Sequence, residues 1–252
     1  MTGREGTDIM LVGATYKTRL TKKECVAEGT MAFYFEKPSD FFFKPGQYVD
    51  VTLVNPEHTD EEGNIRSFSI ASTPADPFLM LVTRMRDTAF KRSLDAMLSK
   101  NEVLFDGPFG YFTLHHNAVK PAVLLAGGIG IAPFVSMVRN AARLKSAHHI
   151  YLFYSNRRPE DAAFLQVLRE SEKENPGFQL IPTMTAMNGS QQVCSGETGA
   201  IDDVMLDKYL PALRGPIYYI AGPPAMVAAM QEALASGGVD KDDVISEDFV
   251  GY

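Results

Sequence analysis

A glycine-rich turn carries the clearest chemical signal in this sequence. Residues 126–133, AGGIGIAP, follow the dinucleotide pattern G-x-G-x-x-G at Gly128 and Gly130, but Pro133 stands where the third glycine would be. Glycines in such a turn let a pyrophosphate approach the backbone, and the next helix offers it free N–H groups. Proline is tolerated because an N–H in the first helical turn has no intrahelical acceptor. The pattern predicts a phosphate-binding loop; the alternative is a turn required only for tight strand–helix packing.

A second signal is the run Arg66-Ser67-Phe68-Ser69 in a strand-like segment. On a strand, Arg66 and Phe68 share one face, and the two serines share the other. An arginine can bind phosphate through its fork of donors, and an aromatic ring can lie against a planar ligand. Taken alone, however, these four residues fit an ordinary surface strand better than a binding site.

A third signal is a group of cations at the start of a helix predicted over residues 88–99. Arg84, Arg86, Lys91 and Arg92 surround this helix start, where positive charge opposes the helix dipole. A bound anion at the helix N-terminus would resolve the conflict. A solvated basic face, or a docking patch for an acidic partner formed by the three arginines, explains the cluster equally well.

A fourth signal is the turn within residues 218–227, YYIAGPPAMV. Gly222 ends an apolar strand, and Pro223 and Pro224 open a helix. Ligands of open α/β sheets bind beyond the carboxyl ends of the strands. We therefore expect this turn and the 126–133 loop at one ligand-binding edge, unless it is a plain strand–helix connection.

The elements that must position these motifs change character near residue 116. The earlier segments are rich in β-branched and aromatic residues and are separated by turn residues, which is typical of an antiparallel barrel or sandwich. These strand-like runs cover 24–38, 46–54, 65–72 and 78–84. We predict a two-domain protein whose first part, residues 1–116, is an antiparallel β-barrel.

From residue 117 onward, apolar strands alternate with helices, which is typical of a parallel sheet. The strands are expected at 122–126, 150–155, 178–184, 217–221 and near 244–249. The helices are expected at 134–144, 160–171, near 202–210 and at 225–235. Pro159, Glu160 and Asp161 stand where a helix start favours proline and acids. Residues 117–252 are thus predicted to form a nucleotide-binding α/β domain.

Composition and charge exclude several classes of protein. The chain of 252 residues has a net charge of −7, whereas nucleic-acid binding usually needs a basic face, so we expect no nucleic-acid partner. No apolar run reaches membrane-spanning length, and the N-terminus lacks a signal-peptide core, so we expect no membrane association. The two cysteines, Cys25 and Cys194, are too few for a four-thiolate iron–sulfur centre or a disulfide scaffold. We expect a cytoplasmic monomer with reduced thiols. We predict no metal site, because the histidines lie in polar segments.

Taken in order, the motifs resemble those of the ferredoxin–NADP reductase superfamily, the flavin-dependent NAD(P)H oxidoreductases. RSFS at 66–69 is similar to its flavin signature R-x-[YF]-S, and GPFGYFTL at 107–114 to the element that ends its flavin barrel. AGGIGIAPFVSMV at 126–138 is similar to its pyridine-nucleotide loop, and YYIAGPPAMV at 218–227 to a second loop beside it. SEDFVGY at 246–252 is similar to its C-terminal tail. Each motif alone is weak, but five in one order are specific.

The resemblance implies FAD in the barrel, with FMN less favoured, and NAD(P)H on the second domain. Hydride would pass between them, and electrons would continue to a separate ferredoxin- or flavodoxin-like carrier or an oxygenase component. The implied flavin-binding residues are Arg66, Ser67, Phe68, Ser69, Val82, Thr83, Arg84, Thr88, Phe90 and Lys91. The implied pyridine-nucleotide residues are Gly127, Gly128, Ile129, Gly130, Pro133, Gly222, Pro223 and Met226.

The resemblance also implies which residues take part in catalysis. Ser69 would lie near flavin N5, and Glu247 would handle a proton or position the substrate, unless it is an exposed acid of an acidic tail. Phe249 or Tyr252 would cover the flavin face. Phe68 replaces the tyrosine of many members, and Ala221 replaces a cysteine beside the nicotinamide, which implies looser nicotinamide placement without loss of chemistry.

The dinucleotide preference depends on the residues after the second strand of the α/β domain. Ser155, Arg157 and Arg158 stand where an adenosine 2′-phosphate would lie, and an arginine there favours NADP whereas an acid favours NAD. The sequence therefore favours NADP, although Arg157 could instead pair with surface acids. Two other functions stay open: a reductase of free flavin, quinone or another small acceptor, and a flavin-binding sensor or assembly subunit without turnover.

Overall fold

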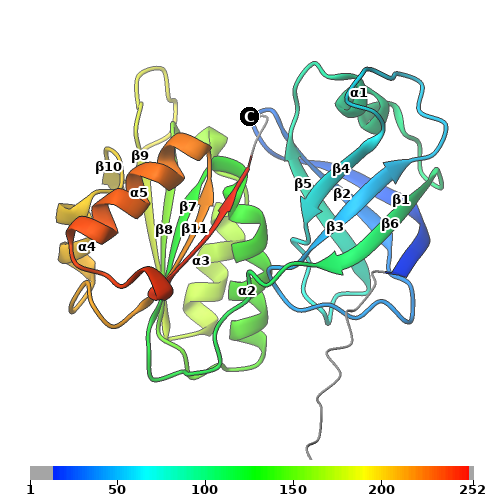
Figure 1. Cartoon of the computed structure of the whole chain (residues 1–252). Coiled ribbons are helices and arrows are strands. Elements are labelled where there is room, and N and C mark those ends of the chain that lie inside the picture. Colours follow the sequence, from blue (N-terminus) through cyan, green and yellow to red (C-terminus); the bar gives the residue numbers. More distant parts are fainter. Residues whose placement is uncertain (1–13, 250–252) are drawn as a thin grey trace, which may run out of the picture.

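The computed structural model describes residues 14–249, which form two β-sheets with helices packed around them (Figure 1). The N-terminal part of the chain builds the first sheet, and the C-terminal part builds the second. None of the helices in residues 14–249 is long and apolar enough to cross a bilayer.

Within the described residues, the first sheet has six strands in the order β4-β3-β6-β1-β2-β5, and all neighbours are antiparallel. An isolated bridge between Ile70 and Leu81 joins the end of β4 to β5 and closes the sheet toward a barrel. The strands are β1 (Ala14–Ala27), β2 (Thr30–Glu36), β3 (Tyr48–Leu53), β4 (Ile65–Ser69), β5 (Phe78–Arg84) and β6 (Glu102–Phe109). The predicted antiparallel domain is confirmed.

The interior of the barrel is filled by alternate residues of its strands. In β3, Val49, Val51 and Leu53 are buried while the residues between them are partly exposed, as the two-residue period of a strand requires. Helix α1 (Ala89–Ala96) closes the barrel by inserting Phe90 and Leu94 into the same core. This packing holds the N-terminus of α1 beside β4, where the RSFS motif lies.

The second sheet has six strands in the described residues, in the order β10-β9-β8-β7-β11-β12, and all are parallel. The strands are β7 (Ala122–Gly127), β8 (Ile150–Asn156), β9 (Phe178–Met184), β10 (Glu197–Thr198), β11 (Ile217–Gly222) and β12 (Val244–Asp248). The helices are α2 (Ile131–Arg143), α3 (Leu165–Glu174), α4 (Asp203–Tyr209) and α5 (Pro224–Ser236). Helices α2 and α3 cover one face and α4 and α5 the other (Figure 1). Every residue of β7 and β11 is buried, which explains their unbroken apolar sequences.

Two parts of the barrel differ from the sequence prediction. The strand-like run at 24–38 is divided by a turn at Glu28 and Gly29 into the end of β1 and the whole of β2. Gly29 has a φ of +65°, a conformation that glycine adopts at little cost. The first half of β1 and all of β6 were not predicted, because β1 is mostly exposed and polar and β6 carries Gly107 and Pro108.

The helix predicted at 160–171 begins later than expected. Residues Pro159–Asp161 form a separate 3₁₀ turn, Phe164 adopts a left-handed conformation with φ of +61°, and α3 starts only at Leu165. Glu160 and Asp161 therefore do not stabilise the start of α3. In the short turn, Asp161 instead accepts a hydrogen bond from Arg158, and Glu160 accepts one from Ser190.

Candidate flavin and nucleotide site

Strand β7 lies at the point where the order of the parallel sheet reverses, with β8 on one side and β11 on the other. In register, Gly127 pairs with Ser155 of β8, and Ala221 of β11 pairs with Glu247 of β12. The carboxyl ends of these strands thus meet at one edge of the sheet. Such a switch point is where open α/β sheets bind ligands.

The three glycines of the 126–133 loop differ in their surroundings. A Cβ on Gly130 would lie 2.2 Å from the carbonyl oxygen of Ala221, and one on Gly127 would lie 2.3 Å from the sulfur of Met226. Both glycines are therefore required for packing against the turn after β11. Gly128, with a φ of +53°, would meet nothing within 4 Å and opens to the edge of the sheet. Gly127 and Gly130 thus fit the interpretation that the loop needs glycine for packing, and Gly128 fits the interpretation that it binds a ligand.

Pro133 and Ile129 are both buried, but in different places. Pro133 occupies the first turn of α2, as expected from the sequence. The Ile129 side chain packs with Ala132 against Ala71, Met80 and Val82 of the barrel. Ile129 can therefore offer a ligand only its backbone, and its side chain joins the two domains.

Gly130→Ala is expected to lower the free energy of unfolding by about 3 kcal/mol, because the new methyl group would overlap backbone atoms of β11 that cannot rotate away. Gly128→Ala is the comparison variant: it adds the same methyl group in open space, so only the left-handed φ should lower its stability, by about 1 kcal/mol. Urea denaturation measures both. Equal stability of Gly130→Ala and the wild type would contradict the packing role.

In the barrel, four predicted flavin-binding residues lie together beside the N-terminus of α1. The Arg66 guanidinium lies 5.3 Å from the centre of the Phe90 ring, and the Phe68 ring lies 5.9 Å from it with a 30° tilt. Lys91 is half-buried, and burial, followed by the charges of Arg86 and Arg66, lowers its pKa. Of the predicted cationic cluster, Arg86 and Lys91 lie here beside Arg66, whereas Arg84 pairs with Asp161 and Arg92 with Asp87.

The N-terminus of α1 is capped from within. The Thr88 hydroxyl accepts a hydrogen bond from the Lys91 amide at 3.3 Å, and the first turn of the helix contains no acid. The Lys91 ammonium donates to the Arg84 carbonyl at 2.7 Å. Cations and the start of a helix therefore meet on one small surface, here called the cradle: Arg66, Arg86, Thr88 and Lys91.

Two acids that the sequence analysis missed contact the cradle. Glu62 accepts from Arg66 at 2.6 Å, and an Asp60 oxygen accepts from the amide of Ala89 at 3.3 Å. Another Asp60 oxygen lies 4.0 Å from Arg66. Both acids belong to the loop between β3 and β4. This loop thus supplies part of the negative charge that the cations require.

The remaining predicted flavin-binding residues lie elsewhere on the barrel. Ser69 is buried and pairs with Tyr48 across β3 and β4, whereas Ser67 is exposed and donates to Asp50. Val82 and Thr83 are buried. The Arg84 side chain extends to Asp161 of the second domain, so it does not lie in the cradle.

Glu247 of β12 faces the barrel across the domain interface. Burial raises its pKa to about 7, and its Oε2 atom is buried without a hydrogen-bond partner in the described residues. The Tyr48 phenol has a raised pKa because of burial and, after it, the charges of Asp50 and Glu247. Glu247 and Tyr48 are therefore close enough to interact. The interpretation of Glu247 as a merely exposed acid is wrong.

The C-terminal tail continues from β12 along the same edge. The Phe249 amide donates to the Gly222 carbonyl at 3.1 Å, and its ring packs partly against the core of the second sheet. Gly222, Pro223 and Met226 lie in the turn that receives Gly127. Tyr252 lies outside the described residues.

Two histidines join the domain connection to the second sheet. His115 donates its amide to the Tyr219 hydroxyl at 2.8 Å, and its Nδ1 lies 3.1 Å from the same oxygen. His148 Nε2 lies 2.9 Å from the His115 carbonyl, so it donates. Residues 14–249 contain no group of three or more side chains arranged to hold a metal ion. We interpret this histidine pair as structural.

Comparison with known proteins agrees with this geometry. The family profile of the oxidoreductase NAD-binding domain matches residues 124–232, from β7 into α5. The fold is similar to that of an Amycolatopsis cytochrome P450 reductase, with a TM-score of 0.80 over 94% of this chain and 71% of that chain, at 24% identity. It is also similar to a ferredoxin NADP⁺ reductase from Neisseria gonorrhoeae with bound FAD and NADP, with a TM-score of 0.77 over 93% of this chain and 98% of that chain, at 19% identity. Both neighbours thus share the two-domain fold of this chain.

One relative of known function is longer than this chain. The reductase component of propane 2-monooxygenase from Mycolicibacterium goodii is 31% identical over 218 residues, which cover 84% of this chain and 61% of the relative. The chain thus spans about three fifths of that relative's length. Together with the profile match and the shared fold, this relative shows that the chain belongs to the ferredoxin–NADP reductase superfamily.

Proposed function

We propose that this protein is a flavoprotein oxidoreductase that transfers a hydride between NAD(P)H and bound FAD and passes the electrons to a separate acceptor. One observation carries the proposal: the cradle lies on the barrel and the glycine loop on the second domain, and Ile129 of that loop packs against the barrel at the interface between them. A flavin held on the barrel and a nucleotide held on the sheet would meet there. In this proposal the barrel comprises residues 1–116 and the nucleotide domain residues 117–252.

The residues of the barrel fit a flavin diphosphate. Arg66, Arg86 and Lys91 carry three positive charges beside the N-terminus of α1, and the partly exposed Phe68 ring lies next to them against the buried Phe90 ring. When bound, FAD would supply the redox chemistry, and the protein would supply orientation and electrostatics. Ser69 and Glu247, one from each domain, are the proposed side chains at the reacting centre.

We propose an oxygenase component as the electron acceptor. The similarity to a protein named as the reductase component of a monooxygenase supports this choice. The free thiols of Cys25 and Cys194 suit a reducing compartment, and we propose the cytoplasm.

We also propose NADPH as the preferred nucleotide, supported now by Arg157 alone. Arg157 is exposed at the end of β8, and no ion pair links it to any described residue. Arg158 is different, because its guanidinium is already bound by Asp161 and Glu28. The sequence assigned the same role to both arginines, but only Arg157 is available to bind a 2′-phosphate in this proposal.

Arg157→Ala is expected to raise the KM for NADPH about tenfold while leaving the KM for NADH nearly unchanged, because a charge-assisted hydrogen bond to a 2′-phosphate is worth about 1.5 kcal/mol or more. Arg158→Ala is the matched control and should affect both nucleotides alike. Steady-state kinetics with each nucleotide measures the two ratios. An equal effect of Arg157→Ala on both nucleotides would remove the case for 2′-phosphate recognition.

An anaerobic titration tests the proposed function as a whole. The purified protein, reconstituted with FAD, should show a flavin absorption spectrum that bleaches when NADPH or NADH is added. Failure to bind FAD would rule the function out. Binding without bleaching would favour a flavin-binding sensor or assembly subunit.

A further inference from the structure

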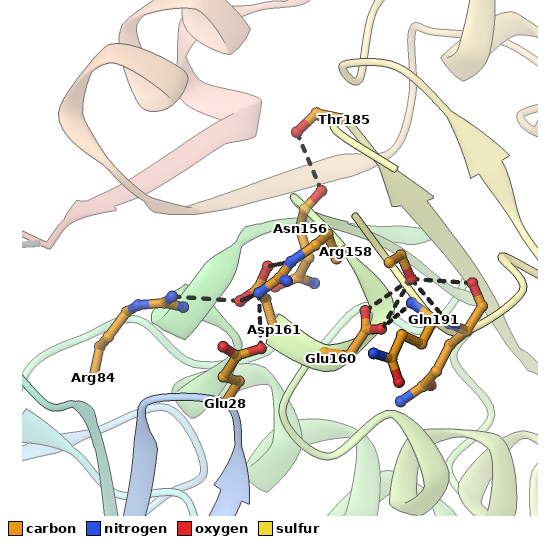
Figure 2. Close-up of polar contacts among 10 residues, drawn as sticks. Glu28, Arg84, Asn156, Arg158, Glu160, Asp161, Thr185 and Gln191 are labelled. Carbon is orange, nitrogen blue, oxygen red and sulfur yellow. Dashed lines mark hydrogen bonds and ion pairs between the residues drawn. The ribbon is translucent and has the colours of Figure 1, made fainter. Parts of the chain in front are cut away.

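A buried carboxylate lies between the two domains and has no role in either half of the proposed site. The Asp161 side chain is only 6% exposed, in the 3₁₀ turn that follows β8. Arg158 reaches it through two hydrogen bonds, from Nε at 3.2 Å and from Nη2 at 3.3 Å. Arg84, at the end of β5 in the barrel, reaches the same carboxylate at 3.4 Å (Figure 2). Asp161 is thus held by one arginine from each domain.

Glu28 extends this cluster back to the barrel. The Arg158 Nη2 atom also donates to Glu28 at 2.8 Å (Figure 2), and the Glu28 amide donates to the Glu160 carbonyl at 2.9 Å. Glu28 and Arg84 belong to adjoining parts of the barrel, because the Met85 amide donates to the Gly29 carbonyl at 2.8 Å. The cluster therefore contains two acids and two arginines, with no net charge, and crosses the interface three times.

The environment of Asp161 keeps it ionised. Burial alone would raise the pKa of this carboxyl, but the hydrogen bonds and charges of Arg158 and Arg84 lower it. A buried carboxylate depends strongly on its partners, because losing one leaves a charge without compensation. Separating the domains at this point would break the ion pairs of Arg84 with Asp161 and of Arg158 with Glu28. The cluster consequently favours one docked arrangement.

Two further interface contacts lie along α2, away from the carboxyl edge of the sheet. The Ser136 hydroxyl donates to the Ser72 carbonyl at 2.6 Å, and Arg139 pairs with Asp76 at 2.9 Å. A small apolar cluster around Ile129 and Val82 lies at the same interface. These contacts could serve as a pivot by themselves. The Asp161 cluster adds a second attachment, next to the strand end that carries Ser155.

We propose that Asp161 is a positioning residue: by binding Arg84 of the barrel and Arg158 of the nucleotide domain, it sets the angle at which the flavin and nucleotide half-sites face each other. The expected effect of Asp161 on the rate of flavin reduction rests on the proposed function. Its expected effect on domain orientation does not. It also assigns Arg158 to domain docking and not to nucleotide selection. Glu28 and Arg84 share this assignment.

Asp161→Asn tests the proposal in the FAD-loaded protein. Its flavin reduction rate, measured by anaerobic stopped flow, should fall at least about tenfold with NADH and NADPH alike, because a 1 Å misplacement can cost about a hundredfold in rate. The dissociation constant for FAD should stay within about twofold, since the cradle is untouched. Asp161→Glu, which restores the charge, should recover part of the rate.

Small-angle X-ray scattering supplies a readout that does not depend on activity. Asp161→Asn should give a larger radius of gyration than the wild type, whereas Glu197→Gln should not. Glu197→Gln is the matched control because it breaks an ion pair with Lys208 inside the second domain. If the protein proved not to bind FAD, the proposed function would fail, but scattering of the isolated chain would still report on domain docking.

A double-mutant cycle keeps the test valid if Asp161→Asn folds poorly. Arg84→Gln should open the interface in the same way, and Arg84→Gln combined with Asp161→Asn should be no worse than the more damaging single variant. Scattering identical to the wild type in all soluble variants would overturn the proposal. An opened interface with unchanged reduction rates would also overturn it, because the angle would then not matter.

Discussion

Arg66→Ala is expected to weaken FAD binding by about 10- to 100-fold, because a hydrogen bond to a charged group contributes about 1.5 to 3 kcal/mol. Arg66 is a cation of the cradle, and its guanidinium lies 5.3 Å from the centre of the Phe90 ring. No other arginine of the barrel combines these contacts in the described residues. Fluorescence titration of the apoprotein with FAD measures the effect.

Arg92→Ala is the matched control for this change. Arg92 lies on the same helix that begins at the cradle and carries the same charge as Arg66, but it is exposed and pairs with Asp87. Removing it should change FAD affinity by no more than about twofold, since exposed ion pairs contribute little. If both variants bound FAD as tightly as the wild type, the cradle would not be the phosphate site.

Arg66→Lys separates charge from geometry at this position. The Arg66 guanidinium donates to the Glu62 carboxylate and to three backbone carbonyls, in the loop between β3 and β4 and at the start of β4. A lysine keeps one positive charge but cannot make this fork of bonds. We therefore expect an FAD affinity between those of Arg66→Ala and the wild type.

The sequence alone predicted the strands and helices that position the site. Strands β7, β9 and β11 lie within one residue of their expected limits. Strands β7 and β11 are continuous apolar runs buried on both faces, and in β9 every residue but Gln179 is buried. The glycine loop was predicted for a sound reason as well, since a buried strand and an amphipathic helix flank it. The local pattern of apolar residues was sufficient to predict the limits of those strands whose side chains are almost all buried.

What the sequence could not predict depends on contacts between distant residues. Asp60 and Glu62 looked like ordinary loop acids, and only the fold brings them to Arg66 and the start of α1. Asp161 looked like a residue that stabilises a helix start, and the left-handed Phe164 delays that helix. Arg157 and Arg158 are adjacent and chemically identical, so the sequence could not tell them apart. The 3₁₀ turn at Pro159–Asp161 brings Asp161 to Arg158.

Glu247→Gln is expected to stabilise the protein at alkaline pH and to leave its stability nearly unchanged at acidic pH. Burial raises the folded-state pKa of Glu247 to about 7 from an ordinary value of 4.5. Between these two values the folded protein binds more protons than the unfolded chain, so stability falls as pH rises through this window. Below pH 4.5 the carboxyl is neutral in both states and costs nothing, and above pH 7 the full cost of a buried charge is present.

The glutamine side chain introduced by this substitution would be neutral at every pH, so the variant should be the more stable protein at pH 8, by on the order of 2 kcal/mol after allowing for partial exposure. At pH 4.5 the two proteins should be nearly equal. Urea denaturation of both proteins at several pH values isolates this effect, because all other groups titrate identically in each. Asp248→Asn, which removes the adjacent exposed carboxyl, is the matched control.

The same variant tests whether Glu247 acts at the reacting centre. The carboxyl faces Tyr48 of the barrel across the interface where a flavin and a nucleotide would meet. If Glu247 handles a proton there, the rate of flavin reduction should depend on pH with an inflection near 7 in the wild type, and Glu247→Gln should lose it. An inflection that survives in Glu247→Gln, together with the expected gain in stability at pH 8, would make Glu247 a buried acid without a part in the reaction.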